Sequence, residues 1–418
     1  MSLRTAVFVN DYCHINGGAS RVAIDEAVAL AADGVDVVFL GACGPVCREL
    51  AESRVRVVCL GQPELIQVRA SPSVVVQGLW NGAARRAMQA ILAPLDPAST
   101  VVHLHGYTKA VTTSPVRAAV QAGFTVVCTL HDFFSACPNG AFFDYVRAAP
   151  CERRALSLDC LGTHCDKRAY SHKLFRSART ALQSWAGLFP RGVRHHISLS
   201  RRSAALLAPY LGAEAVVYPV ENIVDVARRA PVPVAERRAI VAVGRLDPEK
   251  GCELLADAAA EAGLELVFVG DGALRARLEA RPHVRVTGWL APAAVEAALD
   301  EARALIFPSL WYETYGLVVS EAAARGVPSV CSDIAAPAER IEHGVDGLVF
   351  RAGDRAGLVA ALRRLADDAV VAALGAAAYE RFWADPPDAR RHVAQLREVY
   401  DRALAAERGA TLDRECAA

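Results

Sequence analysis

The sequence lacks an excess of charge of either sign, because 46 lysines and arginines balance 46 aspartates and glutamates over 418 residues. A neutral chain creates no overall field that would attract nucleic acid or an anionic membrane. We therefore expect no nucleic-acid partner and at most peripheral contact with a membrane. A binding site for an anion has to be built locally, from a few side chains.

Long apolar segments are missing as well. No window approaches the roughly 20 consecutive apolar residues of a membrane-spanning helix, and the opening MSLRTAVFVNDYCHINGGAS has neither the basic start nor the apolar centre of a signal peptide. We expect a cytoplasmic protein, at most peripheral at the inner face of the membrane. Its 12 cysteines should then carry reduced thiols.

Hydrophobic residues make up 53% of the chain, which is too long for one ordinary core and has enough apolar content for two. Strand-like Val/Ile/Leu runs such as TAVFVN, TVVHLHG, AIVAVG and ALIFPS alternate with helical segments, a pattern typical of parallel sheets covered on both faces. The predicted fold class is α/β, with two Rossmann-like doubly wound domains facing a cleft.

Domain boundaries follow from the same pattern. A proline-punctuated, poorly periodic stretch separates the two series of strands and reads as a linker. The expected parts are an N-terminal domain over 1–219 with a cysteine-rich insertion at about 137–170, a linker over 220–236, a second domain over 237–380, and a C-terminal helix over 381–418 that packs back on the first domain.

The loop after the predicted strand AIVAVG carries two cations, Arg245 and Lys250, beside a predicted helix start at Asp247 and Pro248. Cations at the positive end of a helix cost ~0.3 to 1 kcal/mol each unless an anion lies between them. A bound diphosphate would supply that anion. The alternative is that both side chains point into solvent.

The stretch PSLWYETYGLVVSEAAARGVPSV places Glu313 in a loop and Glu321 on a helix expected to run from about Gly316 to Ala324. Gly316 would leave room for a phosphate at the free amides of the helix. Eight residues at the helical rise separate the two acids by up to ~12 Å, so they should hold two different hydroxyl-bearing groups rather than act together on one atom. Taken alone, each could be an ordinary solvated acid.

Several motifs in order carry a family resemblance. VGRLDPEKG, VGDG and ETYGLVVSEAAARGVPSV resemble the donor-binding domain of the retaining family 4 glycosyltransferases, which have the GT-B fold. NGGASRV, HLHG, CTLHD and VENIVD are similar to N-terminal and interdomain motifs of the same family, so the resemblance covers nearly the whole chain.

The resemblance implies a hexosyltransferase that moves a sugar from a nucleotide-diphosphate sugar to a hydroxyl of a sugar, lipid-linked or small-molecule acceptor, with retention and without a catalytic metal. The setting would be bacterial surface polysaccharide, glycolipid or other glycoconjugate biosynthesis. The residues implied to bind the donor are Arg245, Lys250, Glu313, Thr314, Gly316, Leu317 and Glu321.

Among these, Arg245 and Lys250 would hold the diphosphate, Glu313 the sugar hydroxyls and Glu321 the ribose. The implied catalytic set is His131, Arg245, Lys250 and Glu313. His131 would face the sugar from the first domain, unless it is only a structural histidine. The residues implied for the acceptor or a phosphate are Gly17, Gly18, His105 and Asp132.

The insertion contains Cys137, Cys151, Cys160 and Cys165 in a stretch of weak periodicity. A subset of the family has a similar cysteine-bearing insertion. Four thiolates in a reducing compartment suit a structural zinc, with His164 able to replace one of them. Two disulfides, or four unliganded cysteines, are the alternatives.

Other functions remain open on the sequence. A sugar phosphorylase or a nucleotide-sugar epimerase of the GT-B fold would share the cleft and the phosphate grip. A zinc-stabilised scaffold protein with a vestigial site is the alternative from a different class, although a dead site has no need for cations at a helix start. The fold alone does not decide between them.

Overall fold

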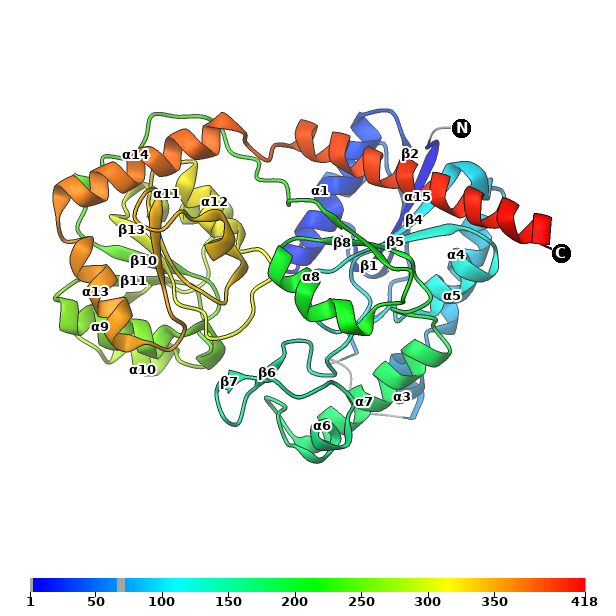
Figure 1. Ribbon diagram of the computed structural model, residues 1–418, viewed down its shortest axis with the longest axis horizontal. Coiled ribbons are helices and arrows are strands. Elements are labelled where there is room, and N and C mark those ends of the chain that lie inside the picture. The colour runs from blue at the N-terminus through cyan, green and yellow to red at the C-terminus, as the bar shows by residue number, and fades with distance from the viewer. Residues whose placement is uncertain (1–2, 66–71, 418) are drawn as a thin grey trace.

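The computed structural model describes residues 3–65 and 72–417. They form two α/β lobes that lie beside each other, with the C-terminal helix lying across the N-terminal lobe (Figure 1). Both sheets are parallel throughout, as the near-continuous apolar strands predict. The expected pair of doubly wound domains is confirmed.

The N-terminal sheet has seven strands in the order β3-β2-β1-β4-β5-β8-β9. Its strands are β1 (Thr5–Tyr12), β2 (Asp36–Cys43), β3 (Arg56–Cys59), β4 (Thr100–Leu104), β5 (Thr125–Thr129), β8 (His195–Ser198) and β9 (Val216–Pro219). The C-terminal sheet has six strands in the order β12-β11-β10-β13-β14-β15. They are β10 (Ile240–Val243), β11 (Leu266–Val269), β12 (Val284–Val286), β13 (Ala304–Phe307), β14 (Ser329–Ser332) and β15 (Gly347–Phe350).

Helices cover both faces of each sheet. Those of the N-terminal domain are α1 (Gly18–Ala32), α2 (Arg48–Ala51), α3 (Pro72–Leu79), α4 (Gly82–Leu92), α5 (Ser114–Gln121), α6 (Leu158–Gly162), α7 (Tyr170–Trp185) and α8 (Arg201–Leu207). Those that follow are α9 (Cys252–Ala262), α10 (Arg275–Glu279), α11 (Pro292–Asp300), α12 (Leu317–Ala323), α13 (Arg355–Arg364), α14 (Asp368–Ala384) and α15 (Ala389–Ala417).

Short 3-10 turns complete the regular structure, namely η1 (Pro97–Ser99), η2 (Ala208–Tyr210), η3 (Val234–Glu236), η4 (Pro248–Lys250) and η5 (Ala336–Arg340). The insertion is more regular than its weak periodicity suggests, because it contains α6, the first part of α7 and a small antiparallel pair of β6 (Phe143–Asp144) and β7 (Ala149–Pro150). None of the described helices is long and apolar enough to cross a bilayer.

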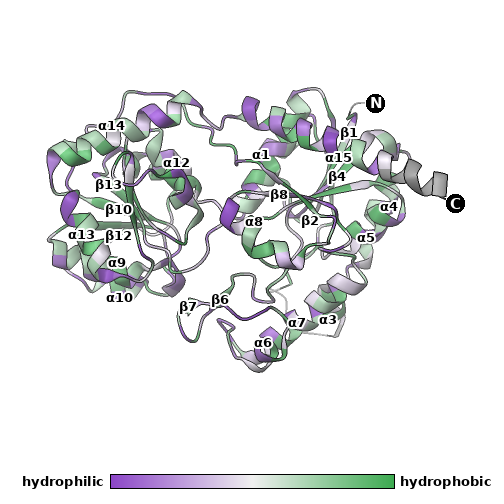
Figure 2. Cartoon of the chain, viewed as in Figure 1, coloured by the Kyte–Doolittle hydropathy of each residue, from purple (hydrophilic) through white to green (hydrophobic). Residues whose placement is uncertain are grey.

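Helix α15 contributes to the core of the N-terminal domain. Leu396 and Tyr400 are fully buried and belong to the same cluster as Phe8, Val101 and Val127 of the sheet. The hydroxyl of Tyr400 lies 2.6 Å from His103 Nδ1 on β4. The green strands at the centre of both lobes in Figure 2 mark the two cores that these contacts fill.

The chain therefore passes between the domains twice. The first passage is the segment after β9, and the second joins α14 to α15. The two passages touch each other, because the amide of Val224 donates to the carbonyl of Pro387.

Candidate active site

The donor loop, residues 245–250, connects β10 to α9 at the carboxyl end of the second sheet. Lys250 lies in the 3-10 turn η4 and not in the first turn of α9, which begins at Cys252. Gly251 separates the two with φ +71, and an added Cβ would collide with the carbonyl oxygen of Pro308. Glycine is needed here for both the left-handed backbone and the close approach.

The cations of the donor loop already have carboxylate partners. Arg245 Nη1 lies 2.7 Å from Asp247 Oδ2, and its Nη2 lies 3.8 Å from Glu249 Oε1. Burial acts to raise the pKa of Asp247, but Lys167 and Arg245 outweigh it and the net pKa shift is downward. Acidic side chains thus balance these cations in the structure, so the alternative that both point freely into solvent does not hold, and their binding of a diphosphate stays a prediction.

Lys250 and Glu313 form a close ion pair across the edge of the sheet. Glu313 Oε1 also accepts from Trp311 Nε1 at 2.6 Å and from Ser309 Oγ at 3.3 Å. Burial alone would raise the pKa of Glu313, yet Lys250 and these donors lower it, so the carboxylate is ionised. The contacts all use Oε1, which leaves Oε2 to meet a ligand.

Gly316 immediately precedes α12 with φ +76, close to the helix start expected from the sequence. An added Cβ would lie 2.7 Å from Pro337 Cγ and 3.3 Å from Phe307 Cζ. The glycine is therefore required by its backbone and by packing against Pro337. The expectation that its missing side chain makes room for a phosphate is wrong. Its neighbour Leu317 still presents one of the first helical amides, which have no acceptor within the helix.

Glu321 lies apart from the Lys250–Glu313 pair. Burial raises the pKa of Glu321, while Arg21 and Arg325 act in the opposite direction. Arg21 belongs to α1 of the N-terminal domain and pairs with Asp25 at 3.3 Å. Figure 1 shows α12 and α1, which begins at Gly18, on the facing sides of the two lobes.

His131 lies just after the carboxyl end of β5 and contacts a second histidine. Its Nε2 lies 2.9 Å from His105 Nδ1, and His105 Nε2 lies 3.5 Å from the buried carboxylate of Glu26. A proton on His105 Nε2 facing Glu26 favours His131 as the donor in the first contact, with its Nδ1 left as an acceptor. His392 of α15 lies 3.2 Å from the other oxygen of Glu26.

The remaining acceptor-side candidates lie at the same end of the first sheet. Burial raises the pKa of Asp132 to about 6, although the amide of Phe134 donates to its carboxylate. Gly17 has φ +103, and an added Cβ at Gly17 or Gly18 would meet no atom within 4 Å. Open backbone at this loop is what the approach of a ligand requires.

Contacts across the cleft bring the two sets of residues together. Thr314 Oγ1 donates to the carbonyl of His131 at 3.0 Å. Lys167, from the insertion, reaches Asp247 at 2.9 Å and Glu249 at 3.4 Å in the donor loop. Sequence reasoning missed Lys167, because nothing in a local pattern indicates a partner in another domain.

Other contacts that sequence reasoning missed could have been expected from the local spacing of residues. Asp247 and Glu249 stand two and four residues after Arg245, a spacing that permits ion pairs within the loop. Trp311 stands two residues before Glu313, and its ring lies 4.9 Å from Lys250 Nζ. All three residues hold the expected cations in place.

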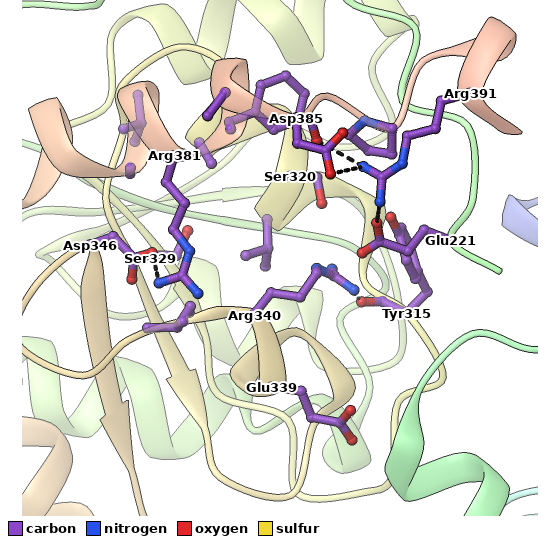
Figure 3. A pocket seen from close by; sticks show the side chains of 18 residues that line it. Glu221, Tyr315, Ser320, Ser329, Glu339, Arg340, Asp346, Arg381, Asp385 and Arg391 are labelled. Atoms are coloured by element: carbon purple, nitrogen blue, oxygen red, sulfur yellow. Dashed lines mark hydrogen bonds and ion pairs between the residues drawn. The ribbon is translucent and has the colours of Figure 1, made fainter. Parts of the chain in front are cut away.

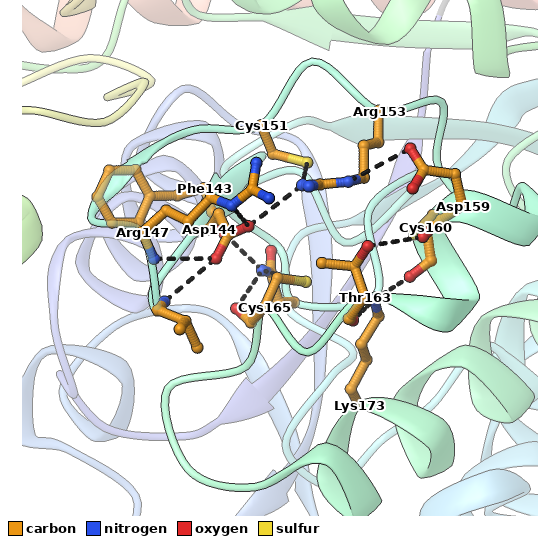
Figure 4. A network of polar contacts seen from close by, with 12 residues as sticks. Phe143, Asp144, Arg147, Cys151, Arg153, Asp159, Cys160, Thr163, Cys165 and Lys173 are labelled. Carbon is orange, nitrogen blue, oxygen red and sulfur yellow. Dashed lines mark hydrogen bonds and ion pairs between the residues drawn. The ribbon is translucent and has the colours of Figure 1, made fainter.

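The four cysteines of the insertion lie in one lobe, and Figure 4 shows three of them, Cys151, Cys160 and Cys165. Among the described residues, the group of three metal-ligating side chains with ligand atoms within 4.8 Å of one another is Glu26, His103 and His105. Cys137 Sγ instead lies 2.9 Å from Asn139 Oδ1, and Cys151 Sγ lies 3.7 Å from Arg153. The thiols are not joined as disulfides.

A pocket of about 520 Å³ lies behind α12, between α14 and the two connections of the domains (Figure 3). Its charges are mostly paired: Arg381 contacts Asp346 at 3.0 Å and Arg391 contacts Glu221 at 3.4 Å. Arg340 stacks on Tyr315. No residue of the donor loop lines this pocket, so it is separate from the candidate active site.

Sequence comparison decides the family. Residues 16–228 match Glycosyltransferase Family 4, and residues 237–368 match Glycosyl transferases group 1. The chain belongs to glycosyltransferase family 4.

Curated relatives of this family 4 protein match it over part of their length. It is 34% identical to a glycogen synthase of Mycobacterium tuberculosis over 211 residues, which are 46% of this chain and 49% of that one. It is 39% identical to a GDP-mannose-dependent alpha-mannosyltransferase of Mycolicibacterium smegmatis over 109 residues, 26% of this chain and 29% of the other. The match thus spans half or less of these relatives.

Solved structures match the family 4 fold over nearly the whole chain. Sucrose-phosphate synthase from Thermosynechococcus elongatus has a TM-score of 0.67 at 19% identity, with 96% of this chain and 100% of that chain covered. Anabaena HepE in complex with UDP and glucose has a TM-score of 0.65 at 18% identity, with 95% and 99% covered. These similarities establish the GT-B fold.

The buried histidines predict a stability that falls in acid. Burial lowers the pKa of both His131 and His196 to about 4, below the ordinary value of 6.5. Between these two pKa values the histidine is protonated in the unfolded chain and neutral in the folded chain. Each histidine therefore lowers the free energy of unfolding by about 1.4 kcal/mol per pH unit as the pH falls.

His196 lies away from the cleft, so replacing it removes the proton uptake of one histidine without altering the candidate active site. The free energy of unfolding of His196→Gln should fall less steeply from pH 6.5 toward 4 than that of the parent, by about one proton. Denaturant titrations at a series of pH values give both slopes. Parallel slopes for parent and variant would show that His196 is not held neutral by the fold.

Proposed function

We propose that this protein is a retaining glycosyltransferase that transfers a hexose from a nucleotide-diphosphate sugar to a hydroxyl of an acceptor. The observation that carries the proposal is the contact of Thr314 with the carbonyl of His131, which brings the Lys250–Glu313 pair of one domain beside the histidine of the other. A site shared between two domains allows closure to exclude water from the reaction.

Charge development explains the choice of residues. As the bond between sugar and diphosphate breaks, negative charge grows on the leaving phosphate, and Arg245 and Lys250 are cations positioned to stabilise it. Each must turn from a carboxylate toward the phosphate, because both are paired in this structure. The amides of Gly316 and Leu317 would add to the grip.

The remaining roles concern the sugars. Glu313, ionised and free at Oε2, would accept hydroxyl protons of the transferred sugar, and Glu321 would bind the ribose of the nucleotide. His131, with Nδ1 as an acceptor, would position a sugar hydroxyl from the first domain. None of these roles requires a catalytic metal, and the acceptor would approach over Gly17, Gly18 and Asp132.

Replacing each of the two acids by alanine tests this assignment. Glu321→Ala should weaken the binding of a nucleoside diphosphate by about tenfold, the scale of a hydrogen bond to a charged group, and leave its unliganded stability nearly unchanged. Glu313→Ala should instead lower turnover with a given sugar. Calorimetric titration and steady-state kinetics separate the two effects, and unchanged nucleotide affinity in Glu321→Ala would remove the ribose role.

Product stereochemistry separates transfer with retention from the competing GT-B reactions. An axial linkage in the donor should stay axial in the product, whereas an inverted product would exclude the proposed mechanism. A sugar phosphorylase would consume phosphate and release a sugar phosphate, and an epimerase would need no acceptor. Incubation with a panel of nucleotide sugars, with and without acceptors, distinguishes these activities.

The structural zinc remains a proposal of its own. The sulfurs of Cys137, Cys151, Cys160 and Cys165 lie in one lobe, but three of them already contact Asn139 or Arg153, so zinc would require these contacts to change. Elemental analysis of the purified protein measures the metal directly. About one tightly held equivalent that is lost in Cys160→Ser would support the site, and no metal together with free thiols would reject it.

A further inference from the structure

A second pocket, of about 410 Å³, lies in the N-terminal domain between helices α3 and α7. Lys109 from the loop after β4 and Phe134 from the loop after β5 contribute to its wall, together with Arg176 and Arg179 of α7. We name it the α7 pocket. Open parallel sheets bind ligands beyond the carboxyl ends of their strands, and these two loops lie at those ends.

The α7 pocket is strongly cationic in a chain of zero net charge. Its lining includes Lys109, Arg168, Arg176 and Arg179, and among the described residues that line it none is an aspartate or glutamate. Arg176 is neutralised by the buried Asp166 at 2.7 Å. For the other three, the described residues provide no ion pair within 4 Å, so positive charge is left over for a ligand.

Arg179 is the most informative of these cations. It is only 6% exposed, and its guanidinium makes one hydrogen bond to the described part of the chain, from Nη1 to the carbonyl of Thr108 at 2.8 Å. Its Nε has no acceptor among the described residues. Arg303, buried to a similar degree at 5% exposure, donates to four carbonyls and a carboxylate.

This difference separates a structural arginine from one that awaits a partner. A buried guanidinium with few acceptors is costly unless an anion joins it. The nearby acids do not fill that place: Asp11 accepts the amides of Lys109, Ala110 and Val111, and Asp132 accepts that of Phe134. Both carboxylates are thus held by backbone amides, and they act on Lys109 and Arg179 only from beyond ion-pair distance.

The pocket also has an apolar side. The ring of Phe134 lies 5.6 Å from the guanidinium of Arg179, and Phe175 lines the pocket from α7. Three aliphatic side chains on α3 and α7 are exposed near it, Val75 at 41%, Val76 at 63% and Leu174 at 46%. A ligand with an anionic group and an apolar or ring-bearing body would satisfy both sides.

We propose that the α7 pocket binds a phosphate ester carried by the acceptor, with the phosphate on Lys109, Arg168 and Arg179 and the apolar part against Phe134 and Phe175. The proposal rests on the proposed function, because it assigns the acceptor of that reaction to a chemical class. Arginine suits this role, since its planar fork can give two hydrogen bonds to one phosphate.

The first test uses inorganic phosphate in a background that lacks the donor grip, Arg245→Ala/Lys250→Ala. Phosphate should still bind to this background protein. Adding Lys109→Ala/Arg168→Ala should raise the dissociation constant for phosphate by about tenfold or more, as expected for the loss of charge-assisted contacts. Arg54→Ala/Arg56→Ala is the control, because it removes two exposed cations of the same domain. An equal loss of phosphate affinity in the pocket variant and in the control, or no loss in the pocket variant, would overturn the proposal.

A second readout avoids reliance on free phosphate. With an intact donor site, Lys109→Ala/Arg168→Ala should raise KM for a phosphate-bearing acceptor and leave the affinity for nucleoside diphosphate unchanged. Binding to phosphatidylglycerol vesicles that depends on Lys109 and Arg168 would assign the ester to a lipid headgroup, and glycerol 3-phosphate binding without vesicle binding would assign it to a soluble acceptor. A parent that binds no nucleoside diphosphate would refute the donor site instead.

Discussion

Replacement of Arg245 or Lys250 by alanine should lower turnover by a factor of ~10² or more, the scale of losing one preorganised donor at a developing charge. Each side chain is the cation of a close ion pair at the carboxyl end of β10 and β13, where a diphosphate would lie. Steady-state rates with a nucleotide-sugar donor measure the effect. Near-normal turnover in both folded variants would refute the assigned site.

A set of matched variants separates the catalytic role of Lys250 from the destabilising effect of leaving Glu313 without its cation. Lys250→Ala leaves Glu313 buried without its cation, so some of the loss could come from the stranded carboxylate. Lys250→Ala/Glu313→Gln removes that charge and should recover stability without recovering turnover. Arg363→Ala, at an exposed position on α13, should behave like the parent. Full recovery of turnover in the double variant would show that Lys250 acts only by neutralising Glu313.

Replacement of Tyr400 by alanine should lower the free energy of unfolding by about 3 to 5 kcal/mol, as expected for removing a fully buried ring. Tyr400 is 0% exposed and packs against the N-terminal sheet through Phe8, Val101 and Val127. Hydrogen exchange should show the loss in β1, β4 and α1, with the strands of the second domain protected as before.

The phenylalanine variant provides the control for Tyr400. Tyr400→Phe keeps the ring and removes only the hydroxyl beside His103, so it should cost about 1 to 3 kcal/mol, the price of an unsatisfied buried polar group. A Tyr400→Ala protein within 1 kcal/mol of the parent would show that α15 is not part of the core. Loss of protection in the second domain instead of the first would lead to the same conclusion.

The sequence predicted the parts of the fold that depend on local pattern. Runs such as those of β1, β4 and β10 are apolar on both faces, which only a covered parallel sheet accommodates. The start of α12 was placed within a residue, because Gly316 is a strong punctuation signal. The predicted start of the helix after the donor loop was less exact, because Gly251 interrupts the helix and leaves Lys250 in a separate 3-10 turn.

The site was predictable as a set of residues but not as a set of contacts. Arg245, Lys250 and Glu313 were named from motifs, but their contacts with Asp247 and Trp311 were not. The distant Lys167, which pairs with Asp247, was missed as well. Pairing across domains depends on how two independently folding sheets face each other, and no periodicity in the chain encodes that. The cationic α7 pocket escaped notice for the same reason: its arginines and lysine come from separate segments.

The return of α15 has a consequence for synthesis on the ribosome. The N-terminal sheet is complete by β9, but the helix that covers Phe8, Val101 and Val127 emerges only after the entire second domain has been translated. The nascent first domain therefore waits with an apolar face open, a state prone to aggregation and suited to capture by chaperones. A polypeptide released early, between α14 and α15, would carry both sheets and still display this face, so the cell's degradation machinery could recognise an unfinished chain by its surface.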